Sequence, residues 1–163
     1  MSAKTDILNN VLTTLQSITT ANGYATNMTS TNCERVLRVW GDIGASVMPW
    51  LGFADVSTTY RHDPSANIEG YMTITVVGHV SAATPAACTT QITALEDDLI
   101  AAMCGAARQQ RGSDINGVNA IGTKVLKSSN DIGAPDGVDS TGGYGTISMD
   151  FEVRFMRTIE VTP

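Results

Sequence analysis

The strongest structural signal in this chain is a strict alternation of apolar and polar side chains near its C-terminus. Over residues 147–155 every second residue is apolar, and the residues between them are polar or charged. A period of two places the two sets on opposite faces of a β-strand. We therefore predict a strand over about 145–157, whose buried face carries Ile147, Met149, Phe151, Val153 and Phe155.

Two further stretches predict a long β-hairpin in the middle of the chain. In residues 71–80, Met72, Ile74, Val76 and Val80 alternate with Tyr71, Thr73, Thr75 and His79, and an apolar-rich run over 49–60 precedes this stretch. The connection over 61–67 is polar and contains Asp63-Pro64, a turn signal. Ten residues of strand reach ~33 Å, which is longer than the core of a small domain needs. We therefore expect the tip of the hairpin to project beyond the body.

Helical spacing occurs twice. Apolar residues recur every three to four positions over 6–21, and Asn22-Gly23 supplies a stop signal. A second helix is predicted over 85–104, with Thr84 as N-cap and Pro85 in the first turn. Shorter strands are predicted over 34–40 and 117–127, a glycine-containing loop over 41–48, and a flexible acidic loop over 128–143.

The order of these elements is helix, strand, long hairpin, helix, hairpin. Strands that follow one another, with helices set apart, are typical of an α+β domain. We predict a single domain over 1–163, with a mainly antiparallel sheet, a long projecting hairpin and two helices packed on one face.

Composition excludes several functional classes. The formal charge of −6 disfavours nucleic-acid binding, which depends on neutralising phosphates. Three cysteines without a CxxC pair argue against a disulfide scaffold and a zinc module. There is neither a run of ~20 apolar residues nor a pattern typical of a signal peptide. We expect a soluble, intracellular protein that does not enter a membrane.

The chain is also unusually poor in charge. Charged residues make up 16% of it, against ~25% in ordinary domains, and it contains 21 threonines. Interface cores are depleted in charge, so a subunit covered by neighbours tolerates such a surface. The alternative is an uncharged surface that stays exposed to solvent.

No catalytic constellation emerges from the sequence. His62 and Asp63 form an adjacent base–carboxylate pair, but no G-x-S-x-G motif supplies a nucleophile, and we expect an exposed hairpin tip. His79 lies on the polar face of its strand and is expected at the surface. The neighbouring acids of the second helix, Glu96, Asp97 and Asp98, are expected to be solvated. Cys88 and Cys104 are expected to be small, buried apolar residues of that helix.

Metal and phosphate sites find no better support. Asp131, Asp136 and Asp139 lack the spacing of an EF-hand, so we expect no calcium site there. The glycines of 142–145 resemble a phosphate loop only in glycine content, because the Lys and the following helix are missing. We expect no enzymatic activity, no cofactor and no metal.

A set of motifs is spread along nearly the whole chain. It begins with the helix over 7–18, followed at once by Asn22-Gly23-Tyr24 in the stretch ITTANGYATN, and with the short strand at 36–40. It continues in the strand PWLGFADVS and its return YMTITVVGHV, in a helix ending LEDDLIAAM and in the final strand GTISMDFEVRF. In this pattern the chain resembles the tail terminator (tail-completion) proteins of long-tailed bacteriophages. The chain departs from the family pattern in its longer loop over 128–143 and in its glycine-rich residues 41–48.

The resemblance implies a structural virion protein without enzymatic activity. Such a subunit forms a ring, typically a hexamer, that caps the tail tube, stops tube polymerisation and joins the head connector. Its expected partners are therefore further copies of itself, the tail tube protein and the head–tail connector protein. Its expected location is the tail or neck of the virion, after assembly in the host cytoplasm. DNA would pass through the lumen without specific binding.

Two groups of residues are candidates for these contacts. Arg61, His62 and Asp63, at the hairpin tip, are predicted to contact a neighbouring copy or a partner. Asp131, Asp136 and Asp139 are predicted to form an acidic belt in the lumen that repels phosphates. The alternatives are another head–tail connector or tail tube subunit, an unrelated intracellular binding module for a small ligand or peptide, or an enzyme with a site built from unlinked residues.

Overall fold

The computed structural model describes residues 3–62, 67–105, 120–133 and 143–158. These residues form an α+β fold, as predicted, with two helices and a mostly antiparallel five-stranded sheet. The elements are α1 (Ala3–Gln16), β1 (Cys33–Glu34), β2 (Trp50–His62), β3 (Asn67–Ala82), α2 (Pro85–Cys104), β4 (Ala120–Ile132) and β5 (Gly143–Thr158). Three short 3-10 helices lie between α1 and β2: η1 (Thr20–Asn22), η2 (Trp40–Asp42) and η3 (Ala45–Val47).

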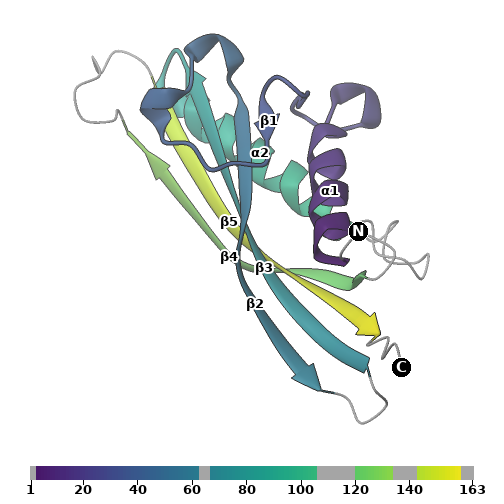
Figure 1. Ribbon diagram of the computed structural model, residues 1–163. Coiled ribbons are helices and arrows are strands. Elements are labelled where there is room, and N and C mark those ends of the chain that lie inside the picture. The colour runs from purple at the N-terminus through teal and green to yellow at the C-terminus, as the bar shows by residue number, and fades with distance from the viewer. Residues whose placement is uncertain (1–2, 63–66, 106–119, 134–142, 159–163) are drawn as a thin grey trace.

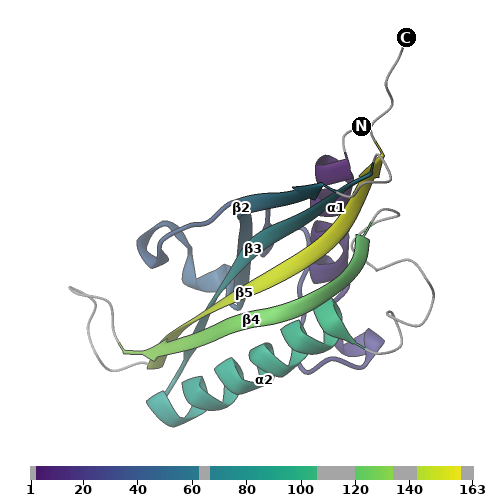
Figure 2. The ribbon, with the colours of Figure 1, turned by 90° about the horizontal axis from the view of Figure 1, so that it is seen from below.

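The strand order in the sheet is β1-β2-β3-β5-β4. The short β1 runs parallel to the start of β2, and all other neighbours are antiparallel. Both helices cover the same face of the sheet (Figure 1), and α2 follows β4 and β5 (Figure 2). We call the helix-covered face the inner face and the opposite one the outer face.

The central strands are long. β2 pairs with β3 from Trp50↔His79 to His62↔Ile68, and residues 63–66 between them lie outside the described part of the chain. β5 accompanies β3 over its full length, as far as Asn67↔Thr158. Where it is described, the far end of the sheet therefore has three strands rather than the two of an isolated hairpin. Projection of the hairpin tip stays a prediction.

The core lies between the inner face and the two helices. The five alternating residues of β5 are at most 1% exposed, which confirms their predicted orientation. They pack in one cluster with the apolar stripes of both helices, including Ile7, Leu15, Leu95 and Leu99. The period-two pattern of β5 and the helical period of α2 thus bury their apolar faces against each other.

The boundaries of α2 agree with the sequence signals. The Thr84 hydroxyl accepts a hydrogen bond from the Ala87 amide at 3.2 Å, so the predicted N-cap is confirmed, and Pro85 opens the helix. The first helix is shorter than predicted, because α1 ends at Gln16. The stop signal acts later: Gly23 closes η1 with a φ of 88°, a left-handed conformation that glycine adopts readily.

The strand predicted over 34–40 is wrong. Only Cys33 and Glu34 pair with β2, and residues 35–48 then pass across the outer face; we call residues 35–48 the crossing segment. Its apolar residues Val36, Leu37 and Val39 are between 40% and 69% exposed. The apolar run that predicted a strand thus belongs to a segment that covers the outer face of the sheet. Its apolar side chains are exposed to solvent.

The acidic loop predicted over 128–143 is also partly wrong. Residues 128–132 belong to β4 and pair with β5 from Ser128↔Met149 to Ile132↔Gly145, and only 134–142 lie outside the described residues. The glycines at the start of β5 have a packing role. A Cβ on Gly145 would overlap Ile92 of α2, and one on Gly143 would overlap the carbonyl oxygen of Thr84. These positions let the start of α2 approach the strand closely.

Candidate functional site

The predicted contact residues at the hairpin tip lie at the far end of β2. Arg61 and His62 are exposed, and Asp63 lies outside the described residues. The Arg61 guanidinium sits over the ring of Tyr71 at 5.1 Å from its centroid, a cation–π contact. Arg61 is thus held on the outer face, and it is available there to a partner.

Of the predicted acidic belt, Asp131 is the residue that the structure describes. It is exposed near the end of β4, opposite Thr146 of β5, and it borders a pocket on the outer face. Asp136 and Asp139 lie outside the described residues. The grouping of the three carboxylates therefore stays a prediction.

Charges on the far half of the outer face are arranged in pairs across strands. Glu69 of β3 accepts hydrogen bonds from the Tyr71 hydroxyl at 2.8 Å and from Arg154 of β5. These contacts lower the pKa of Glu69, with the Tyr71 hydrogen bond contributing most, and raise that of Arg154. Lys124 of β4 pairs with Glu152 at 2.8 Å. Opposite charges thus lie side by side on neighbouring strands of this face.

His79 lies elsewhere than predicted. It is 4% exposed, not a surface residue, because the crossing segment covers it. Its Nδ1 lies 3.0 Å from the Thr146 hydroxyl, and its Nε2 lies 3.2 Å from the carbonyl oxygen of Arg38. A carbonyl only accepts, so a neutral ring donates from Nε2 and accepts at Nδ1. Burial lowers the pKa of His79, although the hydrogen bond to Arg38 acts in the opposite direction.

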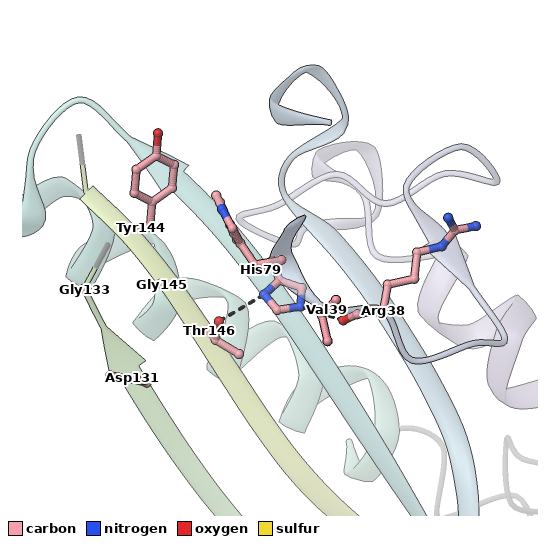
Figure 3. A pocket seen from close by; sticks show the side chains of 9 residues that line it. Arg38, Val39, His79, Asp131, Gly133, Tyr144, Gly145 and Thr146 are labelled. Carbon is pink, nitrogen blue, oxygen red and sulfur yellow. Dashed lines mark hydrogen bonds between the residues drawn. The ribbon is translucent and has the colours of Figure 1, made fainter. Parts of the chain in front are cut away.

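A pocket of about 410 Å³ lies beside His79, between the crossing segment and the ends of β4 and β5. Its aromatic walls come from His79, Trp40 and Tyr144; the last two rings meet edge to face, with centroids 4.7 Å apart. Figure 3 shows the imidazole between Thr146 and the backbone of Arg38, whose guanidinium points away. That guanidinium binds Glu34 at 2.7 Å. We call this site the aromatic pocket.

The prediction that all three acids of α2 are solvated is wrong. Asp97 is exposed, but Asp98 is 7% exposed and accepts hydrogen bonds from the backbone of residues 25 and 26. Glu96 accepts hydrogen bonds from Ser128 at 2.6 Å and Asn130 at 3.3 Å on β4. Asp98 and Glu96 thus have structural partners on neighbouring segments. The predicted burial of Cys88 is confirmed, whereas Cys104 is only partly buried.

The two edges of the sheet form a second candidate site. From Phe53 onward, β2 has no described strand on the side away from β3, and β4 has none on the side away from β5. Pairing shifts register at three residues: Val56 in β2, and Ile121 and Leu126 in β4. Each is a bulge residue, and these side chains are 57%, 48% and 47% exposed. Bulges at both edges thus direct apolar side chains outward.

Two buried polar side chains of the described residues, His79 and Asp98, are both engaged within the fold. In the described ranges no three His, Cys, Asp or Glu side chains gather where they could hold a metal ion. Both ring nitrogens of His79 have hydrogen-bond partners in the fold. Both carboxylate oxygens of Asp98 also have such partners. No helix among the described residues is long and apolar enough to span a membrane.

Sequence reasoning missed both His79 and Asp98. Their partners lie 41 and 72 residues away along the chain, at Arg38 and Thr26. No local pattern marks such partners, because they are brought together only by the folded chain.

Comparison with known proteins adds no identification. The sequence matches no protein-family model, and no curated protein aligns with it significantly.

Proposed function

We propose that the protein is a structural subunit that assembles head-to-tail with further copies of itself into a closed ring. In its specific form, the proposal is a tail terminator of a long-tailed bacteriophage. Such a ring would cap the tail tube, stop its polymerisation and present a surface to the head connector. The proposal combines the sequence resemblance with the surface chemistry of the sheet edges.

The observation that carries the proposal is the concentration of exposed apolar side chains at the two edges. Five of the nine large apolar residues exposed in the described ranges lie there: Val56 and Tyr60 on β2, and Ile121, Leu126 and Ile132 on β4. Apolar patches on a surface are typical of interaction sites, and we propose that these residues form one at each edge. The edges belong to opposite ends of the strand order, so a contact between them joins two different patches. Repeating such a contact yields a ring when the rotation closes.

The bulges favour a particular kind of contact. A bulge disrupts the regular ladder and blunts an edge against the addition of another strand. We therefore expect the edges to meet through their apolar side chains rather than by extending the sheet. The ion pairs of the outer face, such as Lys124 with Glu152, would stay within each subunit of the ring.

Size-exclusion chromatography with light scattering tests the proposal. Purified protein at high concentration should elute as a discrete multimer near six subunits. A clean monomer would argue against the ring and for the binding module. Native mass spectrometry of the same sample would give the subunit number.

The acidic belt is a separate part of the proposal. Replacement of Asp131, Asp136 and Asp139 by Lys should leave ring assembly nearly normal while slowing DNA ejection, because lumen carboxylates repel phosphates. Unchanged ejection by particles that carry the triple variant would remove the belt from the proposal.

A second candidate, a binding module for a small ligand or peptide, is favoured by the aromatic pocket. Its volume of about 410 Å³ falls within the range of small-molecule sites, ~300–1,000 Å³. Both nitrogens of His79, however, already have partners within the fold. A fragment screen by NMR that perturbs Trp40 and Tyr144 together, with a monomeric protein, would favour this candidate.

A further inference from the structure

His79 joins two parts of the molecule that are distant in sequence. The imidazole belongs to β3, and it bonds Thr146 of β5 on one side and the Arg38 carbonyl on the other. Arg38 lies in the crossing segment, so the ring links that segment to the outer face of the sheet. Trp40, two residues further on, covers Tyr144 and contacts the His79 ring edge to face.

Both tryptophans of the chain touch this imidazole. The ring of Trp50 stacks on it with centroids 5.7 Å apart, and Trp40 lies at the same centroid distance. The aromatic rings and the crossing segment together keep His79 out of water. A neutral ring satisfies both of its bonds here, since the Thr146 hydroxyl donates and the Arg38 carbonyl accepts.

The charged groups described around His79 provide no close countercharge for a protonated imidazole ring. The guanidinium of Arg38 points away and is held by Glu34, and Asp131 borders the same pocket from β4 but is exposed to solvent. From β5, Tyr144 and Thr146 contribute a ring and a hydroxyl, and β2 contributes Trp50. Among the described residues, no carboxylate forms an ion pair with His79.

We infer that His79 is a pH-operated latch: when its ring takes up a proton, the crossing segment leaves the outer face and the aromatic pocket opens. The closed state holds a neutral imidazole that is 4% exposed, whereas the open state lets water hydrate the charged ring. Burying a charge without a countercharge is costly, so protonation of His79 favours the open state. The inference goes beyond the proposed function and does not depend on ring formation.

Proton linkage sets the size of the effect. Burial holds the pKa of closed-state His79 below the ordinary value of 6.5, whereas the open state titrates as a hydrated imidazole. Between these two values the open state binds one more proton than the closed state. The ratio of open to closed protein then rises about tenfold for each pH unit of acidification.

Tryptophan fluorescence tests the latch directly, because both fluorophores contact His79 and the chain has only one other histidine. We expect acidification from about pH 7.5 to about pH 4.5 to shift emission to the red and to increase acrylamide quenching, while far-UV circular dichroism stays constant. His79→Gln should abolish this transition. His62→Gln, which changes the exposed histidine at the end of β2, should leave it intact.

NMR of the wild-type protein keeps the test decisive even if His79→Gln does not fold. The ring signal of His79 should titrate with the same midpoint as the fluorescence change, and the amides of η2 should lose protection while those of β3 and β5 keep it. Fluorescence that stays constant through the His79 titration would overturn the latch. So would a transition that persists in His79→Gln, or one in which the whole sheet loses protection together.

Discussion

The carboxylate of Asp98 binds both the backbone amide and the hydroxyl of Thr26, through Oδ2 at 2.8 and 2.6 Å. Its other oxygen accepts from the Ala25 amide at 3.0 Å. One buried side chain of α2 thus fastens the segment that follows η1 to the helix. Hydrogen bonds to a charged acceptor are stronger than neutral ones, so this contact orders a stretch that has no regular secondary structure.

Asp98→Ala should therefore lower the free energy of unfolding by about 1–3 kcal/mol, because it leaves three part-buried donors without their charged acceptor. Chemical denaturation monitored by circular dichroism measures the change. Asp97→Ala is the matched control, since its side chain is exposed on the same helix, and it should stay within about 0.5 kcal/mol of wild type. Equal effects of the two substitutions would contradict the role of Asp98.

Phe151 lies at the centre of the buried face of β5 and is fully buried. Its truncation in Phe151→Ala should cost ~3–5 kcal/mol, the usual penalty for removing a buried aromatic ring. Ser148→Ala, on the outer face of the same strand, should have little effect. A denaturation midpoint unchanged by Phe151→Ala would mean that the facing of β5 is misassigned.

The close approach of α2 to β5 gives a third prediction. Gly145→Ala should destabilise the protein by about 1–3 kcal/mol, because the new methyl group overlaps Ile92 in a packed core. Gly122→Ala on β4 is the control, since nothing lies within 4 Å of a Cβ there. If both glycines tolerate alanine equally well in thermal unfolding, the packing of α2 on β5 is looser than described.

Alkaline pH should unfold the protein partly through Cys33. Burial raises the pKa of this thiol from 9.0 to about 12, with a smaller contribution from Glu34. Between these values the unfolded state loses a proton that the folded state keeps, so stability falls as pH rises above 9.0. Urea unfolding measured at rising pH should show this slope, and Cys33→Ala should reduce it. An identical slope in the variant would exclude Cys33 as the cause.

Much of the fold could be predicted because its main elements have strong local patterns. The alternation in β5 can be recognised from the sequence of that strand alone. The same holds for the N-cap, the first-turn proline and the apolar stripe of α2. The full length of β4 was harder to predict, because its second half is polar. That half is a strand because it pairs with β5, so tertiary pairing outweighs local β-propensity. The opposite error occurred in the crossing segment. Its apolar residues Val36, Leu37 and Val39 suggested a strand, but their side chains are exposed and do not belong to the sheet.

The candidate sites were less predictable than the fold. The exposure of Arg61 and His62 followed from the polar connection beside them. The burial of His79 did not, because it depends on a segment that approaches from 41 residues away. The bulges at Val56, Ile121 and Leu126 depend on the register between strands, which a single sequence does not display.

Complementation between two edge variants tests the head-to-tail ring most directly. Val56→Asp disables the β2 edge and leaves the β4 edge intact, whereas Leu126→Asp does the reverse. Thr59→Asp and Ser129→Asp are controls that add the same charge to the same strands at exposed polar positions. Circular dichroism should show that all four variants are folded.

Native mass spectrometry then gives the decisive readout. The wild type and both controls should form the ring, each edge variant alone should be a monomer, and an equimolar mixture of the two edge variants should form a heterodimer through the one intact pair of edges. A wild-type monomer, or edge variants that still form rings, would contradict the account.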